Sequence, residues 1–390
     1  MRNENELILL CSCFTLANEE QKRIDHLLSS QLDWEYITQF VIRHNIVNLA
    51  YRNIQNASVA ISPETSQLLR NVVLQNNAQS LFQTGFLLKL LKLFEKESIV
   101  VIPFKGPALS QILYNNPAVR SYSDLDILVK ITDITCASRL LVQQGFVPEI
   151  ELTERALAAY VQTEDDITFH NPKSNLIVEL HWEISGQYLR YPLGFDCFRE
   201  NLQKVEIAGQ TVYSFSTEDL LFYLCVHGNK HMWSRLEWLC CVAELIKCHD
   251  DINWRKVFDR ANEFQCVRMV SFSLILVSKL LNTKLPAHVT ERLLDNRQMT
   301  QLRCTVENNL FSVDQTQLDE EKRFSRFHLQ NRDSWQDRLH YCCRLLFQPT
   351  YQEWHTWSLP GHLSFLYFFL RPLRLGWEFL KNTRKKSVRH

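Results

Sequence analysis

Glycine is scarce in this chain, and its scarcity limits the folds and sites that the chain can build. Only nine of the 390 residues are glycine, and they do not cluster. Dinucleotide-binding folds, P-loop enzymes and hydrolases with a nucleophile elbow need closely spaced glycines, either for approach of the backbone to phosphate or for a strained turn. None of their motifs occurs here, so these classes are excluded. The 12 tyrosines and 23 phenylalanines instead favour a helix-rich protein with bulky core packing.

Length and charge balance indicate a folded protein with two or three sub-domains. A chain of 390 residues exceeds what one hydrophobic core usually covers. The chain is 46% hydrophobic and 22% charged, close to the average for globular proteins. Lys plus Arg equals Asp plus Glu at 43 each, so no overall field draws the protein to nucleic acid. We therefore expect no strong nucleic-acid partner.

The cysteines and the apolar segments predict a cytoplasmic protein. The 12 cysteines are scattered or in vicinal pairs along a long chain, unlike the disulfide framework of a small secreted domain. Acidic residues precede only four aliphatic residues at the N-terminus, so we expect no signal peptide. The longest apolar stretches, 270–281 and 365–370, are shorter than the roughly 18 to 20 residues that cross a bilayer. No transmembrane segment is predicted.

The C-terminal segment joins aromatic residues to a basic tail. The stretch 357–379 is rich in aromatic residues, and Glu378 is the single acid among the basic residues that follow and overlap it. These basic residues are Arg371, Arg374, Lys381, Arg384, Lys385, Lys386 and Arg389. A solvated tail, or a terminal helix packed on its own domain, is the favoured interpretation. A peripheral contact with a membrane surface is the alternative.

Hydrophobic periodicity divides the chain into three regions. Residues 1–95 carry apolar positions at helical spacing, strands and helices alternate over 96–215, and helical spacing returns over 216–390. The pattern predicts an α+β fold, with a small mixed β-sheet flanked by N-terminal and C-terminal helical regions. The predicted strands are 99–104, 125–129 and 175–182.

Two carboxylates lie at the start of the second predicted strand. Asp124 and Asp126 share a face because alternate side chains of a strand point the same way, while Leu125 and Ile127 enter the core. The two acids would raise one another's pKa unless a cation or a proton sat between them. Mg²⁺, which prefers oxygen ligands and also binds phosphate, relieves that repulsion. An Asp-capped strand with both acids solvated is the structural alternative.

Three further features support a phosphate site. Lys105 and Gly106 follow the first predicted strand at a helix start, where free backbone N–H groups and a lysine can hold a triphosphate. Glu179 lies on the third predicted strand and can complete a two-metal cluster. Arg120 stands just upstream of the two aspartates and can grip phosphate with its planar guanidinium group.

The order of these residues resembles the uncharacterised nucleotidyltransferase family of the DNA polymerase beta superfamily. The resemblance covers the chain from about residue 30 to 376. The stretches that carry it are 104–109, Tyr114, 120–129, 178–182, His227, 233–239 and 370–375.

This resemblance implies an enzyme that binds an NTP, such as ATP, with Mg²⁺. It implies transfer of the nucleotidyl group to an unknown small-molecule or macromolecular acceptor, with loss of pyrophosphate. The nucleotidyltransferase core that it implies would then correspond to the region of alternating strands and helices at 96–215.

The family's site residues carry over position by position. Asp124 and Asp126 match the metal-binding pair, and Glu179 matches the third carboxylate, which can also serve as base. Lys105 and Gly106 match the phosphate-holding turn, and Arg120 and Ser123 are expected beside the nucleotide. Two ions would then clamp the attacking and leaving oxygens.

The chain departs from the family pattern at two places. It has Lys-Gly where the wider superfamily usually has Gly-Ser, which puts the details of triphosphate contact in doubt. It has Cys240 and Cys241 where an aspartate is expected, which weakens any C-terminal polar contact.

Other groups of residues suggest alternative functions for the chain. His227 and His231, four residues apart, could bind zinc, perhaps with Cys225, in a zinc-dependent hydrolase. Packed or acceptor-binding histidines are the favoured interpretation there, because Gly-Asn interrupts the helix between them and no HExxH motif is present. His181 shares the face of Glu179, and we expect it, like His227, in a supporting role at the site or at the core edge. A non-catalytic scaffold with the same fold is a further alternative.

One more acidic pair is a candidate for the third carboxylate. Asp165 and Asp166 could supply it, but the adjacent Glu164 favours an acidic loop.

Overall fold

The computed structural model describes residues 2–293, 296–312, 326–357 and 359–387. Its first part is helical up to Lys96. Local sequence explains the helix starts: Asp33 accepts a hydrogen bond from the backbone of Tyr36, and Ser62 caps the long helix that begins at Pro63. The helices are α1 (Asn3–Cys11), α2 (Asn18–Leu28), α3 (Trp34–Arg43), α4 (Val47–Gln55) and α5 (Pro63–Lys96).

A five-stranded mixed sheet follows, and it confirms the predicted α+β class. The strand order is β1-β2-β5-β4-β3, with β2 and β5 parallel and the other neighbours antiparallel. The strands are β1 (Val101–Pro103), β2 (Asp124–Val129), β3 (Val147–Pro148), β4 (Asp166–Asn171) and β5 (Leu176–His181). The helices between them are α6 (Gly106–Tyr114), η1 (Ile131–Asp133), α7 (Ile134–Gln143) and α8 (Glu154–Tyr160).

A hairpin and short 3₁₀ turns link the sheet to the C-terminal helices. The turns are η2 (Gly186–Tyr188), η3 (Phe195–Cys197) and η4 (Arg199–Asn201), and the hairpin strands are β6 (Gln203–Ile207) and β7 (Gln210–Ser214). The helices that follow are α9 (Thr217–Lys230), α10 (Leu236–Cys248), α11 (Trp254–Glu263), α12 (Val267–Leu280), α13 (Ala287–Thr290), α14 (Arg297–Phe311), α16 (Arg326–Gln330), α17 (Trp335–Phe347), α18 (Tyr351–Trp357), η5 (Gly361–Leu366) and α19 (Tyr367–Ser387).

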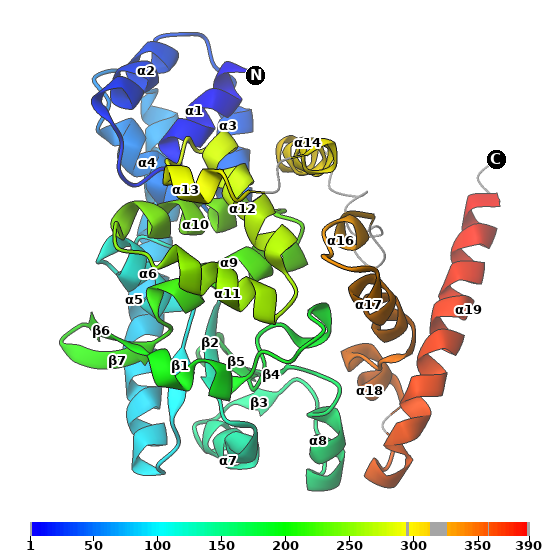
Figure 1. The fold of residues 1–390 in the computed structure, drawn as a ribbon. Helices are drawn as coiled ribbons and strands as arrows, with labels where there is room; N and C mark the ends of the chain where they lie inside the picture. Colours follow the sequence, from blue (N-terminus) through cyan, green and yellow to red (C-terminus); the bar gives the residue numbers. More distant parts are fainter. Residues whose placement is uncertain (1, 294–295, 313–325, 358, 388–390) are drawn as a thin grey trace.

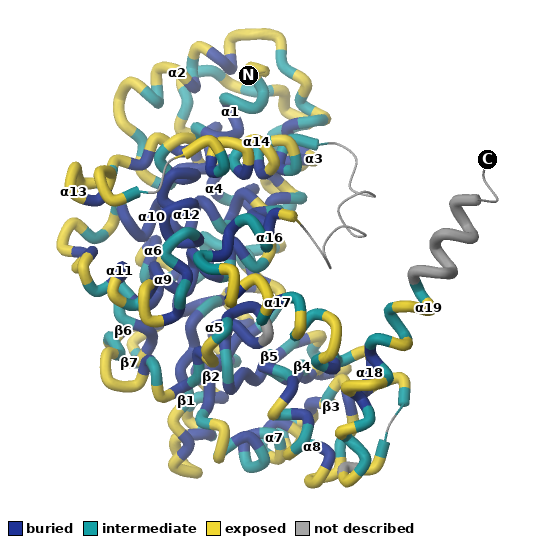
Figure 2. The backbone as a smooth tube through the Cα atoms, turned by 45° about the vertical axis from the view of Figure 1, so that its right-hand side comes forward, coloured by how far each residue is buried: buried dark blue, intermediate teal, exposed yellow. Residues whose placement is uncertain are grey.

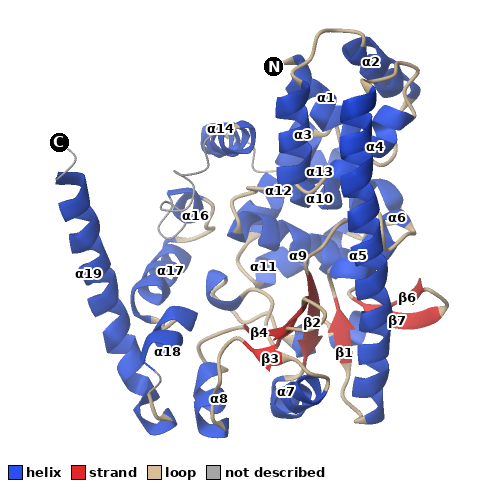
Figure 3. Cartoon of the chain, turned by 180° about the vertical axis from the view of Figure 1, so that it is seen from behind, coloured by secondary structure: helices blue, strands red, loops and turns tan. Residues whose placement is uncertain are grey.

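The helices and the sheet occupy different halves of the molecule. Helices α1 to α4 lie at one end, the sheet lies toward the other, and α9 to α12 lie between them (Figure 1). Helix α5 runs from the N-terminal helices down past the strands (Figure 3). Helices α17 to α19 lie along one side of the sheet half. The boundary between sheet and helices is therefore where strand ends and helix ends can meet.

The described core contains two large clusters of buried apolar side chains. One cluster joins the N-terminal helices to α9–α12 and includes Phe40 and Trp233. The other includes Val178 of the sheet together with Trp354 and Tyr367 from the C-terminal helices. Figure 2 shows buried backbone running through both halves. Core packing therefore joins segments that are far apart in sequence, while the three domain boundaries stay a prediction.

The three strands expected from sequence are present with shifted ends, and others were missed. Strands β1, β2 and β5 correspond to the predicted strands. Strand β4 was expected to begin in an acidic loop, yet its residues alternate between partly buried or exposed and buried positions, as a sheet with one packed face requires. The hairpin turn at Ala208 and Gly209 has positive φ at both residues, as a two-residue hairpin turn of type I′ requires.

An unusual turn joins α9 to α10. Met232 and Trp233 both have left-handed backbone angles, with φ of 52° and 54°. The Trp233 side chain is fully buried and lies over Gly228, where an added Cβ would come within 2.3 Å of its ring. Glycine at position 228 is therefore what allows this tryptophan to fold back onto α9.

Replacing Gly228 with alanine is expected to destabilise the protein. The added methyl group overlaps the rigid, buried indole ring of Trp233, and forcing extra volume into a packed core typically costs about 1–3 kcal/mol. Chemical denaturation measures this loss of unfolding free energy. Gly85→Ala is the matched control, because an added Cβ at Gly85, also on a helix, meets no atom within 4 Å. Equal stability of the two variants would contradict the assigned packing.

Several surface predictions can be compared with the described residues. Within the described ranges, every helix is too short or too polar to span a lipid bilayer. Tyr367 at the start of α19 is buried, whereas Phe369, Leu373 and Trp377 on the same helix are exposed. The side chains from 379 onward, including most of the basic tail, lie outside the described residues. Membrane contact and cytoplasmic location stay predictions.

Candidate active site

The register of β2 and β5 gathers the predicted acidic side chains. Asp126 lies directly opposite Glu179 in this parallel pair. Asp124 is two residues before Asp126, and His181 is two residues after Glu179, so all four occupy one face of the sheet. Strands β2 and β5 are consecutive in the sheet but separated by more than 40 residues in the chain. The fold thus brings together the acids that sequence reasoning had placed on separate strands.

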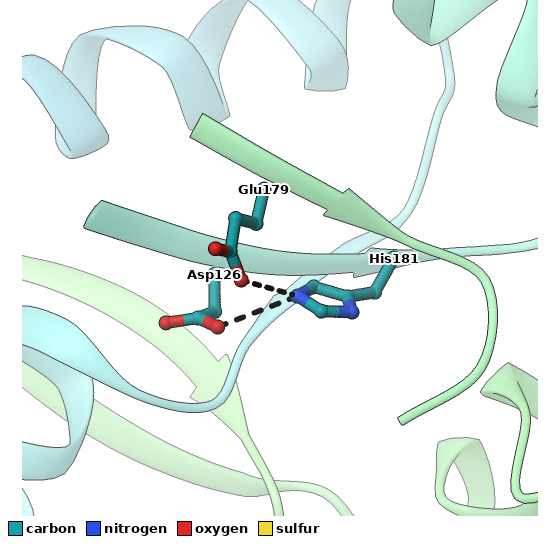
Figure 4. A group of neighbouring side chains, drawn as sticks. All are labelled: Asp126, Glu179 and His181. Carbon is teal, nitrogen blue, oxygen red and sulfur yellow. Dashed lines mark hydrogen bonds and ion pairs between the residues drawn. The ribbon is translucent and has the colours of Figure 1, made fainter. Parts of the chain in front are cut away.

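His181 lies between two of these carboxylates. Its Nε2 is 3.3 Å from Asp126 Oδ1 and 3.3 Å from Glu179 Oε2 (Figure 4). Lys105 approaches the same Asp126 Oδ1, with its Nζ at 2.6 Å. Asp126 is 2% exposed, and its Oδ2 is buried without a hydrogen-bond partner among the described residues. A buried carboxylate with one unused oxygen is suited to bind a cation or a donor.

Asp126, Lys105 and His181 stabilise one another's charged forms. Burial raises the pKa of Asp126, but Lys105 and His181 outweigh it and hold that pKa below its usual range. Burial opposes protonation of His181, yet its hydrogen bonds to Asp126 and Glu179 raise its pKa to about 10. The charge of Asp126 likewise overcomes burial and raises the pKa of Lys105 well above its usual range. At neutral pH, two cations therefore balance this carboxylate.

Asp124 is in a different electrostatic position. Its pKa is raised to about 6, first by burial and then by the negative charges of Asp126 and Glu179. The predicted repulsion between neighbouring acids is therefore present at Asp124, while at Asp126 the two cations relieve it. A further positive charge near Asp124 would stabilise its ionised form.

Lys105 and Gly106 form the turn between β1 and α6. The helix start expected at this point is present, with Lys105 as the cap and Gly106 as the first helical residue. Gly106 has a φ of +52°, which an L side chain rarely adopts, and it lies close to the backbone oxygen of Asp124. This turn therefore holds the start of α6 next to the start of β2.

Arg120 was expected to grip phosphate, and the structure places it in an ion pair. Its Nε is 2.5 Å from Glu237 Oε1, and the two side chains are 11% and 5% exposed. Asn45 Nδ2 donates to Glu237 Oε2 and to the carbonyl oxygen of Ser121, each at 2.8 Å. The pair therefore ties the loop before Asp124 to α10. Ser123 is exposed, and its carbonyl oxygen accepts from Gln83 Nε2 at 3.1 Å.

Part of this site lines a cavity of about 600 Å³, whereas Asp126, His181 and Gly106 are not among the lining residues. Lys105, Asp124 and Glu179 contribute from the sheet half. The loop before β2 adds Arg120 to Ser123, and α9, α10 and the turn between them supply residues from His227 to Trp238. Such a volume lies within the range of about 300–1,000 Å³ that is typical of ligand sites. The cavity thus combines carboxylates, the lysines Lys105 and Lys230, and a helical wall.

Comparison with known proteins places this site in a family. Residues 30–282 match the family described as uncharacterised nucleotidyltransferase. The chain belongs to this uncharacterised nucleotidyltransferase family. All the predicted site residues fall within the matched segment, whereas the stretch 370–375, which also resembled the family, lies beyond it.

Two other comparisons add little to the family assignment. No curated protein shows significant similarity to the chain. A solved structure, an antigenic nucleotidyltransferase-like protein from Paracoccidioides brasiliensis, is 14% identical and aligns with a TM-score of 0.30. That alignment covers 54% of this chain and 96% of the other.

The potential metal ligands of this nucleotidyltransferase-family chain can be compared with the ligands that a metal ion prefers. Asp126, Glu179 and His181 offer ligand atoms within 4.8 Å of one another, the single such group among the described residues. Carboxylate oxygens are the ligands that Mg²⁺ prefers, and the unused Oδ2 of Asp126 is available to a cation. The two carboxylates therefore fit a divalent ion, whereas His181, whose pKa is raised to about 10, would have to lose its proton to join them. Asp124, although predicted as a ligand, is outside that closest group.

The arrangement of His227 and His231 differs from the one that the alternative zinc site requires. His227 and His231 have ring centroids 4.6 Å apart, but they are not in the group of potential metal ligands found among the described residues. His227 instead contacts Tyr223, whose hydroxyl is 3.4 Å from its Nδ1. His181, expected in a supporting role, makes direct contact with both carboxylates.

Glu237 and Tyr223 were missed by sequence reasoning, and Asp166 was assigned to an acidic loop. Glu237 pairs with Arg120, Tyr223 contacts Lys105, and Asp166 lies opposite His181 on β4. The pKa of Asp166 is raised to about 6, first by burial, with Asp165 and Glu179 adding to the shift and His181 opposing it. A signal existed for Glu237, because it lies in the stretch 233–239 that carried the family resemblance. The contact of Tyr223 had none.

Proposed function

We propose that this protein transfers the nucleotidyl group of an NTP to an acceptor and releases pyrophosphate, in a reaction that requires Mg²⁺. The observation that carries the proposal is the register of Asp126 with Glu179, beside Lys105 and next to a cavity of about 600 Å³. Membership of the nucleotidyltransferase family supports the same reaction class. The carboxylate oxygens account for the choice of metal.

Asp124, Asp126 and Glu179 would hold the metal, in one or two ions. When bound, the metal supplies positive charge to the phosphate oxygens and lowers the pKa of the acceptor hydroxyl. Lys105, which lines the cavity, would contact the triphosphate, and Gly106 would shape the turn that carries it. Arg120 keeps the loop before Asp124 in position through Glu237. Most of the rate would then come from positioning and electrostatics.

The reaction balances without a further co-reactant. The acceptor oxygen forms a bond to the α-phosphorus, and the bond from that phosphorus to the oxygen bridging to the β-phosphorus breaks. Pyrophosphate leaves with the electron pair of that bond. Glu179, whose side chain is 28% exposed, accepts the acceptor's proton. The acceptor is a small molecule or a macromolecule with a hydroxyl group.

Label transfer tests this function. The protein is incubated with each of the four NTPs labelled at the α-phosphate, with Mg²⁺ and a cell extract, and both labelled products and pyrophosphate are measured. We expect transfer from at least one NTP, its loss on addition of EDTA, and its recovery with excess Mg²⁺. Glu179→Gln is expected to lower the rate by about 10²-fold or more.

A matched variant and a binding measurement complete the test. Asp250 is exposed in the turn after α10 and outside the cavity, so Asp250→Asn is expected to keep the wild-type rate. Equilibrium dialysis measures NTP binding independently of the acceptor. If no NTP binds in the presence of Mg²⁺, the protein is a non-catalytic scaffold and the proposal is wrong.

A further inference from the structure

Three aromatic rings gather on the helical wall of the cavity. His227 of α9, His231 just after it and Trp238 of α10 form what we call the ring cluster. The ring centroids of His227 and His231 are 4.6 Å apart, and those of Trp238 lie 5.3 Å from His227 and 5.1 Å from His231. All three residues line the cavity that also contains Asp124 and Glu179.

The backbone is shaped to bring these rings together. His231 ends α9 and Trp238 lies in the first turn of α10, so the turn between the helices sets their separation. That turn holds Met232 and Trp233 in the left-handed region and depends on Gly228. Residues held in such sparsely populated conformations cluster at functional sites. Here the left-handed turn connects the two helices whose ends carry His231 and Trp238.

The ring cluster is connected to the phosphate end of the cavity. Tyr223 contacts Lys105 and also reaches His227, whose Nδ1 is 3.4 Å from its hydroxyl oxygen. Burial lowers the pKa of His227 well below its usual range, and the charges of Lys105 and Lys230 lower it further. His227 is therefore neutral at pH 7 and presents an uncharged aromatic ring.

We propose that the ring cluster is the platform on which the nucleobase of the NTP stacks. The inference rests on the proposed function, because that function requires a ligand with a triphosphate at one end and a flat aromatic base at the other. The cavity offers both kinds of contact, because Lys105 and the carboxylates Asp124 and Glu179 line it together with the ring cluster. Every base has a π-face, so a stacking platform suits any of the four NTPs.

Comparison of an NTP with inorganic tripolyphosphate tests the platform. Tripolyphosphate has the charge of the phosphate chain but no base. Affinities of both for the full chain are measured by calorimetry with Mg²⁺, using the NTP that binds most tightly to the wild type. Trp238→Leu is expected to weaken NTP binding about 10-fold or more and to change tripolyphosphate binding less than about twofold.

Further variants separate stacking from folding. Trp238 is partly buried against the helical core, so Trp238→Phe, which keeps a ring, is expected to restore most of the NTP affinity. His231 is exposed, and His231→Ala is expected to weaken NTP binding without unfolding the chain. Trp335 is 67% exposed on α17 and outside the cavity, so Trp335→Leu is the matched control with wild-type affinity for both ligands.

The outcomes distinguish the stacking platform from the proposed transferase function on which it rests. Wild-type NTP affinity in both Trp238→Leu and His231→Ala would overturn the platform, even if transfer is intact. An equal loss of NTP and tripolyphosphate binding would overturn it too, since the rings would then be structural. A rise in the KM for the acceptor with unchanged NTP affinity would assign the rings to the acceptor instead. If the wild type binds neither ligand, the proposed function fails first.

Discussion

Asp126→Asn is expected to lower the rate of nucleotidyl transfer by about 10³-fold or more, equivalent to roughly 4 kcal/mol of transition-state stabilisation. Asp126 is the carboxylate on which the site converges, since Lys105, His181 and the paired strand position of Glu179 all meet there. Asparagine keeps the shape but removes the negative charge, so the loss reports charge rather than volume. Steady-state rates with labelled NTP measure it.

Stability must be measured with the same variant. Removing the charge leaves Lys105 and His181 with less compensation, so Asp126→Asn is also expected to lower the midpoint of thermal unfolding. Circular dichroism at the assay temperature shows whether the variant is folded. A folded variant that turns over at the wild-type rate would rule out the assignment of the site. The exposed Asp250→Asn serves again as the control.

Glu237→Leu is expected to lower the free energy of unfolding by about 3–5 kcal/mol. Glu237 and Arg120 form a buried ion pair, and loss of the acid leaves a guanidinium group buried without its partner. Arg120→Met combined with Glu237→Leu removes both charges and is expected to recover most of the lost stability, because apolar residues can replace a buried pair. Chemical denaturation of the three proteins gives these differences.

The double variant also tests the role first predicted for Arg120. If Arg120 acts only through Glu237, the stable double variant binds NTP with near wild-type affinity. If it also grips phosphate, NTP binding weakens although the fold is retained. Glu307→Gln is the control for stability, since Glu307 pairs with Arg303 in a partly exposed site and its loss is expected to cost less than about 1 kcal/mol. A loss at Glu237 as small as this would contradict the buried-pair argument.

The fold was predictable where residues carry strong local patterns. The strands β1, β2 and β5 are apolar runs bounded by polar or turn residues, and helical spacing before and after them is clear. Strand β4 was missed because Glu164, Asp165 and Asp166 suggested a loop, although Ile167 and Phe169 alternate with polar residues. The hairpin was missed because Ala-Gly is a weaker turn signal than Asn-Gly. In both segments, packing in the folded protein rather than the local sequence determines the strands.

The acidic residues of the candidate site were predictable from the sequence, but the partners of its basic residues were not. Asp124, Asp126 and Glu179 follow from strand alternation and the family resemblance, and the register brings them together. The partners of Lys105 and Arg120 depend on which side chains the tertiary fold places beside them. Glu237 comes from a helix far along the chain, so no local pattern shows that it neutralises Arg120. A basic residue that lies near acidic residues in the sequence can therefore be paired with a different acid in the folded protein.

The packing of Trp354 and Tyr367 into the sheet's core has a consequence for synthesis. Trp354 contacts Tyr160 of α8, with ring centroids 5.4 Å apart, and Tyr367 lies 4.3 Å from Trp354 by the same measure. During translation the strands leave the ribosome well before these two aromatics exist. Until they do, the sheet exposes an apolar surface that chaperones and proteases recognise, so truncated nascent chains are expected to be degraded rather than to accumulate.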